Sequence, residues 1–389
     1  MLAFTLLCSE CGRAASPGQP IWSCPSCGSL LEIQIDLSGL APEAPDLLKG
    51  AVGEPAMGVW RYSALIPVDG EARVSMGEGD TPVVHLAALG RQVGLPNLYA
   101  KLEYYSPTGS FKDRGATVLV SKARELGIGL LVEDSSGNAG ASIAAYCARA
   151  GIKAGIYVPA SAPAAKKAQI AVYGAEVVAV EGTRDDVTEA ALERCRRDGA
   201  YYGSHNWNPF FLEGTKTFAY EVATRFRFDP PEHLVVPVGN GSLFLGSWKG
   251  FRELRDLGLV GSLPKLHVAQ AAGCMPIVHA FQRGLDRTEP IPTAPTVAGG
   301  ISIGRPSRGR QILRVVRESG GGAAAVTDEE ILRYQRSLAS LEGIFCEPTS
   351  AAAFAALPHL VEQGCIDPAE RVLVAVTGIG LKDAEALQR

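Results

Sequence analysis

The sequence predicts an α/β fold with two doubly wound, mostly parallel-sheet domains and a small cysteine knuckle ahead of them. From about residue 98 onward, short apolar runs rich in β-branched residues alternate with helical stretches. That alternation is typical of βαβ units, whose parallel sheets are covered on both faces. The knuckle is predicted by two Cys-x2-Cys pairs within the first 27 residues, a spacing typical of metal-binding ribbons.

The individual elements follow from the same alternation. Strands are expected in "LYAKLEY" (98–104), "LLVED" (130–134), "AGIYVP" (154–159), "AEVVAVE" (175–181), "HLVVPV" (233–238), "KLHVAQ" (265–270) and "RVLVAVTG" (371–378). Helices are expected at 115–126, 139–150, 164–173, 183–197 and 242–257. The small residues of "ESGGGAAAV" (318–326) are interpreted as a loop, and the polar, proline-containing stretch 36–58 as a linker.

The length of 389 residues suits two or more domains. We predict a zinc-ribbon-like knuckle at 1–35, a small domain at 106–205, and a large domain formed by 36–105 together with 206–389.

Composition narrows the class of protein. The chain is 47% hydrophobic and 20% charged, and its formal net charge is −4, which argues against binding to nucleic acid or to an anionic membrane surface. No apolar run approaches the roughly 18 residues of a spanning helix, and the opening "MLAFTLL" is too short for a signal peptide. A cytoplasmic enzyme is therefore expected.

The paired cysteines predict a structural zinc site. Cys8 and Cys11 are separated by twelve residues from Cys24 and Cys27, and the glycine after each pair suits a tight knuckle turn. Four thiolates leave no open coordination position, so the Zn²⁺ is expected to be structural. The alternative is a relic or a disulfide pair, which is less favoured because nothing else indicates secretion.

Three strand-to-helix junctions are candidate ligand sites, because ligands of such sheets bind at the carboxyl ends of strands. Residues Ser135, Ser136, Gly137 and Asn138 open a helix and suit a carboxylate, although a plain helix cap is the alternative. Residues Gly239, Asn240, Gly241 and Ser242 form a turn of backbone donors that suits a phosphate. Thr377, after the last strand, could cap a helix or bind a ring nitrogen.

A lysine in "SPTGSFKDRGA" (106–116) indicates which kind of reaction these junctions could serve. Ser110 and Asp113 predict a capping box, which places Lys112 in the first turn of a helix. The positive end of the helix dipole disfavours the protonated amine, so more neutral, nucleophilic amine is present. An ordinary surface lysine is the alternative. A nucleophilic lysine, a phosphate site and a carboxylate site together indicate a pyridoxal phosphate (PLP) enzyme that acts on a small amino acid.

Several motifs carry a resemblance to a known family across essentially the whole chain. They are "GEGDTPVVHL" (77–86), "SPTGSFKDRG" (106–115), "SSGNAG" (135–140), "VPVGNGS" (236–242), "FCEPTSAAA" (345–353) and "VTGIGLKD" (376–383). Together they resemble the threonine synthases, which are fold-type II PLP enzymes of the tryptophan synthase β superfamily. The cysteine pairs resemble the ribbon found ahead of many archaeal and bacterial members.

The resemblance implies a role for each candidate residue. Lys112 would form the Schiff base with PLP, Asn138 would bind the phenolic oxygen of the cofactor, and Thr377 would face its pyridine nitrogen. The turn 239–242 would hold the cofactor phosphate, and 135–137 the substrate carboxylate. A hydroxyl partner does not force protonation of the pyridine nitrogen, so a mild electron sink is expected. The resemblance also implies a homodimer.

The implied reaction converts O-phosphohomoserine and water to threonine and phosphate, with Lys112 as the general base at Cα. The chain departs from the family pattern Asn-Ser-x-Asn-Pro-x-Arg at "HNWNPFF" (205–211), where Phe211 replaces the arginine that would clamp the substrate phosphate. His205, Asn206 and Lys166 are the candidate substrate-binding residues that remain. A satisfied loop histidine and a solvated lysine are the alternatives for His205 and Lys166.

Because the expected arginine of the substrate-phosphate site is replaced by Phe211, other reactions of the family remain alternatives. A serine/threonine ammonia-lyase or a β-replacement synthase, such as a cysteate synthase, fits the same motifs. A non-catalytic homologue with the ribbon as a docking module is a further alternative. A nicotinamide-dependent dehydrogenase built on the turns at Gly239 and Gly378 is the least favoured, because it lacks an acidic ribose partner and leaves Lys112 unexplained.

Overall fold

The computed structural model describes residues 2–40, 48, 58–291 and 294–383, so most of the predicted linker at 36–58 lies outside the described residues. The chain divides into two compact units. Unit 1 comprises 1–80, 106–108 and 112–217, and unit 2 comprises 81–105, 109–111 and 218–389. The three domains predicted above stay a prediction. Within the described part, no helix is long and apolar enough to cross a membrane.

Unit 1 begins with a small antiparallel sheet in the order β2-β1-β3, formed by β1 (Phe4–Cys8), β2 (Ala14–Ala15) and β3 (Leu31–Ile35). Its inward residues alternate along the strands, as expected of a sheet with one buried face. They join Val118 and Phe210, from two helices of unit 1, in one hydrophobic cluster that also contains Cys8 and Cys24. The cysteine-bearing segment is therefore part of the core of unit 1.

The main sheet of unit 1 is parallel, in the order β8-β7-β6-β9, as the alternating pattern predicts. Its strands are β6 (Leu130–Glu133), β7 (Lys153–Pro159), β8 (Glu176–Val180) and β9 (Tyr201–Tyr202). Its helices are α3 (Lys112–Glu125), α4 (Asn138–Ala150), α5 (Ala164–Ala171), α6 (Arg184–Asp198) and α7 (Pro209–Thr215). Two 3₁₀ segments precede them, η2 (Gly58–Leu65) and η3 (Gly70–Ala72).

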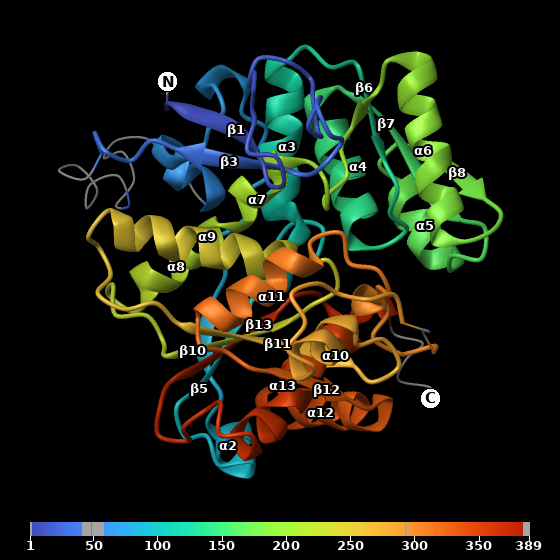
Figure 1. Cartoon of the computed structure of the whole chain (residues 1–389). Helices are drawn as coiled ribbons and strands as arrows, with labels where there is room; N and C mark the ends of the chain where they lie inside the picture. The colour runs from blue at the N-terminus through green and yellow to red at the C-terminus, as the bar shows by residue number, and fades with distance from the viewer. Residues whose placement is uncertain (1, 41–47, 49–57, 292–293, 384–389) are drawn as a thin grey trace. The chain divides into compact units, whose positions relative to one another are not determined.

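Both faces of this sheet are covered (Figure 1). Leu131 packs in one cluster with residues of α3 and α4. Its neighbour Val132 points to the opposite face and packs with Val187 and Ala191 of α6. The strand runs are apolar without alternation because each of their faces is buried.

Unit 2 contains a six-stranded sheet in the order β12-β11-β10-β13-β5-β4, in which only the pairing of β4 with β5 is antiparallel. The strands are β4 (Val83–His85), β5 (Leu98–Leu102), β10 (His233–Pro237), β11 (Lys265–Ala271), β12 (Ala323–Val326) and β13 (Val372–Val376). The helical segments are α2 (Ala87–Val93), η4 (Glu103–Tyr105), α8 (Thr217–Arg225), α9 (Ser242–Asp256), α10 (Pro276–Gln282), η5 (Gly299–Ile301), α11 (Gly309–Glu318), α12 (Asp328–Glu342) and α13 (Pro348–Glu362).

All seven predicted strands and all five predicted helices are present within a few residues of their expected bounds, and the α/β fold class with mostly parallel sheets is confirmed. The loop predicted at 318–326 is wrong in its second half. Residues 323–326 form β12, an edge strand that pairs in parallel with β11. Gly321 permits this pairing, because a Cβ there would lie 1.9 Å from the carbonyl oxygen of Leu266.

Candidate active site

Lys112 is the first residue of α3 and is half-buried. The capping box predicted at Ser110 is wrong, since the Ser110 hydroxyl has no hydrogen-bond partner in the described part of the chain. Asp113 instead accepts hydrogen bonds of 2.6 Å from both the backbone N–H and the hydroxyl of Thr108, and from the Ser142 hydroxyl. These bonds tie the loop before Lys112 to the start of α3 and to α4.

The backbone before Lys112 pairs with the end of β13 in place of the capping geometry. Phe111 donates its N–H to the Thr377 carbonyl oxygen at 3.0 Å, and Ile379 donates to the Gly109 carbonyl oxygen at 3.0 Å. The segment 109–111, which directly precedes the lysine in the chain, is thereby held by two backbone hydrogen bonds rather than by a side-chain cap.

Phe211 of α7 is the apolar neighbour of Lys112. Its ring is completely buried, lies 5.7 Å from the Lys112 Nζ atom, and meets the His205 ring edge to face at a centroid distance of 5.8 Å. The ring rests on Gly115, where a Cβ would lie 2.4 Å from three ring atoms. Gly115 follows Lys112 by one helical turn, so the ring covers the lysine-bearing face of α3.

A buried acid lies behind His205. The His205 Nδ1 atom is 2.8 Å from Glu133 Oε1, and the His205 N–H donates to Glu133 Oε2 at 3.1 Å. Burial raises the pKa of Glu133 well above its ordinary value. Burial, together with the charges of Lys112 and Arg184, lowers the pKa of His205 well below its ordinary value. Both shifts favour the uncharged forms of this pair.

Glu133 was missed by sequence reasoning. The available signal was a carboxylate within the apolar run "LLVED", where a fully buried strand has no reason to carry one unless a partner is present.

The turn between β6 and α4 contains the predicted carboxylate site. Ser135, Ser136, Gly137 and Asn138 are half-buried, and Gly137 caps α4 without any side-chain hydrogen bond to the first turn. The backbone of the turn packs closely against α4 at Gly140, because a Cβ on Gly140 would lie 1.9 Å from the Ser135 carbonyl oxygen. An uncapped N-terminus of a thirteen-residue helix is suited to an anion.

The remaining predicted substrate residues lie on the same side of the parallel sheet of unit 1. Asn206 is buried and, with His205, follows β9, which pairs in parallel with β6. Lys166 is half-buried on α5, three residues before Gln169, whose amide reaches the Thr108 carbonyl oxygen at 3.5 Å. Since carboxyl ends of parallel strands share one edge, the structure brings these residues to the same edge as the turn at 135–138.

In unit 2, the turn between β10 and α9 forms the predicted phosphate site. Gly241 has φ of +77° and caps α9 without a side-chain hydrogen bond. A Cβ on Gly239 would lie 2.9 Å from Ile303, and one on Gly241 would lie 2.6 Å from Ile312. Asn240 accepts a 3.2 Å hydrogen bond from the N–H of Ser307 through its side-chain oxygen. Only glycine fits these two positions, which leaves the backbone donors of the turn exposed to an anion.

Thr377 follows β13, the sheet neighbour of β10, so it ends at the same edge as the phosphate turn. Its hydroxyl is 2.8 Å from the Ser350 hydroxyl and donates to Glu347 Oε1 at 3.2 Å. Ser350 in turn accepts a 3.1 Å hydrogen bond from the Gly378 N–H. Thr377 is therefore part of a buried polar network and does not cap a helix within the described residues.

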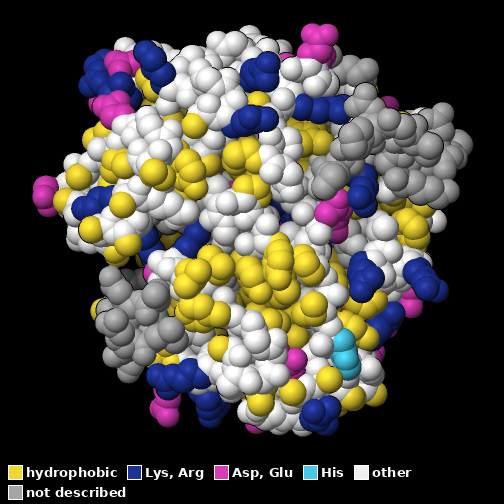
Figure 2. Space-filling view, turned by 180° about the vertical axis from the view of Figure 1, so that it is seen from behind, with side chains coloured by type: hydrophobic (Ala, Val, Ile, Leu, Met, Phe, Trp, Pro, Cys, Tyr) yellow, Lys and Arg dark blue, Asp and Glu magenta, His cyan; other side chains and the backbone are white. Residues whose placement is uncertain are grey.

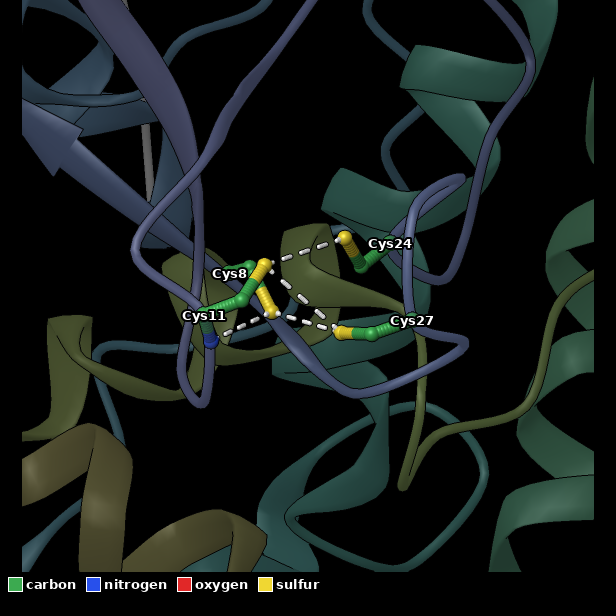
Figure 3. A group of neighbouring side chains, drawn as sticks. All are labelled: Cys8, Cys11, Cys24 and Cys27. Atoms are coloured by element: carbon green, nitrogen blue, oxygen red, sulfur yellow. Dashed lines mark hydrogen bonds between the residues drawn. The ribbon is translucent and has the colours of Figure 1, made fainter.

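The four predicted zinc ligands come together at one point in unit 1, and their sulfur atoms face one another (Figure 3). The Sγ atoms lie 3.4 Å apart for Cys8 and Cys27, 3.8 Å for Cys11 and Cys24, and 3.7 Å for Cys11 and Cys27. Tetrahedral ligation with Zn–S bonds of about 2.3 Å requires sulfur separations of about 3.8 Å. Hydrogen bonds from Ser29 lower the pKa of Cys27 to about 6, which favours the thiolate that a metal binds.

Comparisons with known proteins agree with this arrangement. A model of the family described as pyridoxal-phosphate dependent enzyme matches residues 74–378. The chain is 40% identical to the threonine synthase of Methanocaldococcus jannaschii over 384 residues, which cover 98% of this chain and 94% of that protein. It is also 40% identical to the threonine synthase of Methanosarcina acetivorans over 392 residues, covering 99% and 93% of the two chains.

Among solved structures, the chain resembles the processed form of threonine deaminase isoform 2 from Solanum lycopersicum. The TM-score is 0.68 at 20% sequence identity, and the match covers 96% of this chain and 98% of that one. A pyridoxal 5'-phosphate-dependent aspartate racemase matches with a TM-score of 0.67 and 24% identity over 77% of this chain and 89% of that one. At these identities the likeness shows the fold alone.

Proposed function

Since the chain belongs to the pyridoxal-phosphate dependent enzymes and, among them, to the threonine synthases, we propose that it converts O-phosphohomoserine and water to threonine and phosphate. The observation that carries the proposal is the lysine at the start of α3 together with an uncapped anion site in each unit.

The residues of these sites fit PLP. Lys112 is proposed as the residue bound covalently to the cofactor, and the turn 239–242 as the site of its phosphate, since this turn opens α9 without a side-chain cap and its backbone N–H groups suit an anion. Asn138 is proposed to bind the phenolic oxygen, and Thr377 the ring nitrogen. PLP bound through its aldehyde supplies an electron sink for the electron pair released at Cα.

The protein side chains are proposed to bind the substrate and move its protons. The backbone donors at 135–137 bind the carboxylate and orient the Cα–H bond. The substrate amine would first displace Lys112 from the cofactor, and the freed amine of Lys112 would then take the proton from Cα. Loss of a second proton from Cβ expels the γ-phosphate. A proton then returns to Cγ, water adds its hydroxyl group at Cβ and gives up its other proton, and a proton returns to Cα. The buried ring of Phe211 excludes water from one side of the lysine.

The substrate phosphate has to be bound without the usual arginine. Phe211 is completely buried within an apolar cluster of unit 1, so it forms an apolar wall, and an arginine in its place would bury an unpaired charge beside Lys112. We propose that Lys166 and Asn206 bind the phosphate, because both lie at the carboxyl edge of the same sheet. His205, held by Glu133, is proposed to contact the substrate as a neutral imidazole.

The test is Lys112→Ala, with Lys153→Ala at an exposed lysine as the matched control. The wild-type protein and the control should absorb visible light when PLP is added, and borohydride should fix the cofactor on Lys112. Both should also release phosphate and threonine from O-phosphohomoserine. The Lys112→Ala variant should show no covalently fixed cofactor and should release neither phosphate nor threonine. Turnover of serine or threonine to ammonia without any reaction of O-phosphohomoserine would favour the ammonia-lyase alternative.

A structural Zn²⁺ is the second part of the proposal, because the sulfur separations match a tetrahedral site and the four cysteines form no disulfide. The ion would be held by Cys8, Cys11, Cys24 and Cys27. Elemental analysis of the purified protein should give one zinc per chain, and a Cys24→Ser variant should give none.

We further propose a cytoplasmic homodimer. Figure 2 shows hydrophobic side chains gathered over part of one face. Large hydrophobic side chains that are mostly exposed include Tyr105, Val172 and Leu381. Sedimentation of the PLP-loaded protein should give twice the chain mass of 40.9 kDa.

A further inference from the structure

The network behind Thr377 has one consistent assignment of its hydrogen atoms. The Thr377 hydroxyl contacts Glu347 Oε1 at 3.2 Å and the Ser350 hydroxyl at 2.8 Å, and Ser350 also accepts the Gly378 N–H at 3.1 Å. An ionised carboxylate has no hydrogen to give, so Thr377 donates its single hydroxyl hydrogen to Glu347. Ser350 must then donate to Thr377.

The structure holds Glu347 in the position of the final acceptor. It is 5% exposed and directly precedes α13 as its N-cap, where the helix dipole stabilises a negative charge. Its N–H donates to the Gly378 carbonyl oxygen at 3.0 Å. Its carboxylate lies against Gly378 so closely that a Cβ there would be 2.5 Å from the carboxyl carbon.

Thr377 is left with one lone pair and no hydrogen, because the first lone pair takes the Ser350 hydrogen and its own hydrogen goes to Glu347. Toward any group that faces it, the hydroxyl can therefore only accept a hydrogen bond. A neutral pyridine nitrogen offers only a lone pair and would meet a second lone pair. A protonated pyridine nitrogen offers N–H and fits.

We propose that Glu347 is a positioning residue that makes Thr377 an obligate acceptor, so that the protein binds PLP with its pyridine nitrogen protonated. This inference rests on the proposed function, in which Thr377 faces that nitrogen. It reverses the expectation drawn from the residue type, which was that a hydroxyl partner leaves the ring unprotonated and a mild electron sink.

The protonation state of the pyridine ring matters for the proposed reaction. Removing protons from both Cα and Cβ before phosphate leaves requires strong withdrawal of electrons, and a protonated ring withdraws more than a neutral one. The negative charge of Glu347, relayed by a single hydroxyl, supports the positive ring nitrogen without contacting the cofactor. The network thus gives a hydroxyl-bearing site the electronic effect of a carboxylate.

The experiment uses the full chain loaded with PLP that carries ¹⁵N in its pyridine ring, and follows the nitrogen NMR signal from pH 6 to 9. The wild-type signal should stay at the protonated position throughout. In Glu347→Gln, which keeps the shape and removes the charge, the signal should change to the unprotonated position within this pH range, because the positive ring nitrogen loses its supporting negative charge. Ser350→Ala keeps the Thr377 to Glu347 bond and should resemble the wild type.

Two results would overturn the inference: a wild-type ring nitrogen that is unprotonated across this range, or a Glu347→Gln titration identical to the wild type. The wild-type titration decides even if Glu347→Gln fails to fold. Absence of any visible absorbance with PLP would instead refute the proposed function, since that readout depends on Lys112 and not on the protonation of the ring.

Discussion

Replacing Gly115 by alanine should lower the activity of the site strongly and the stability of the fold by a smaller amount. The new Cβ would lie 2.4 Å from the Cδ1, Cε1 and Cζ atoms of Phe211. Ordinary carbon contacts are about 3.5–4.0 Å, so the ring has to retreat by more than about 1 Å. Phe211 is completely buried, and the retreat disturbs its contacts with Lys112 and His205.

The energetic terms of Gly115→Ala partly offset each other. Overpacking of a dense core costs about 1–3 kcal/mol, while alanine in place of glycine within a helix such as α3 returns about 1 kcal/mol. The net change in the free energy of unfolding is therefore a loss of about 0–2 kcal/mol. A displacement of about 1 Å next to the reacting groups can lower turnover by about 100-fold, so kcat should fall by about 10- to 100-fold.

Urea unfolding and phosphate release from O-phosphohomoserine measure the two quantities in the same preparations. Combining Gly115→Ala with Phe211→Leu should cost less stability than the sum of the single changes, by about 1 kcal/mol, because the smaller side chain leaves room for the Cβ. A Gly115→Ala protein that gains about 1 kcal/mol and keeps full activity would show that the ring is not held against α3.

Three other perturbations have defined outcomes. Removing zinc with a chelator, or by Cys24→Ser, should lower thermal stability and turnover together, because Cys8 and Cys24 share a hydrophobic cluster with Phe210. The control Cys365→Ser should change neither quantity. Unchanged turnover after zinc removal would show that the knuckle is peripheral to the reaction. Gly241→Ala should weaken PLP binding by about tenfold through a strain of about 1–2 kcal/mol, while Gly258→Ala, with a similar φ of +74° and no neighbour within 4 Å, should not. Lowering the pH from 7 to 5 should reduce the free energy of unfolding by about 2 kcal/mol through His267, since burial lowers its folded pKa to about 3 from 6.5 and only the unfolded chain takes up the proton in this window. His267→Gln should reduce the measured loss between pH 7 and pH 5 by about 2 kcal/mol, as urea titrations at both pH values would show.

Sequence patterns located the elements of the two main sheets because a strand buried on both faces needs an unbroken apolar run, and a helix between such strands needs none. The strand at 323–326 was missed for the same reason. Three alanines after a run of glycines have little strand propensity, and the strand exists because β11 offers an unpaired edge and Gly321 lets the chain approach Leu266.

Local sequence was a poorer guide where side chains choose between partners. Ser110 and Asp113 have the spacing of a capping box, yet the backbone at 109–111 pairs with 377–379, more than 260 residues away, and Asp113 binds Thr108. The partner of His205 was likewise hidden, because Glu133 lies 72 residues earlier in the chain. Such choices depend on tertiary proximity, which no local pattern records.

The hydrogen-bonding role of Thr377 could not be predicted from its residue type. A threonine hydroxyl can donate or accept, and its sequence neighbours do not say which. Glu347 and Ser350 lie about thirty residues earlier, in "EPTS", and reach the hydroxyl because the bridge between Cys346 and Ile379 brings the start of α13 to the end of β13. Once a carboxylate occupies the donor side, only the acceptor side is left for a ligand. The electronic character of this site therefore follows from the direction of three hydrogen bonds, and the same threonine in front of an apolar residue would favour the opposite protonation state.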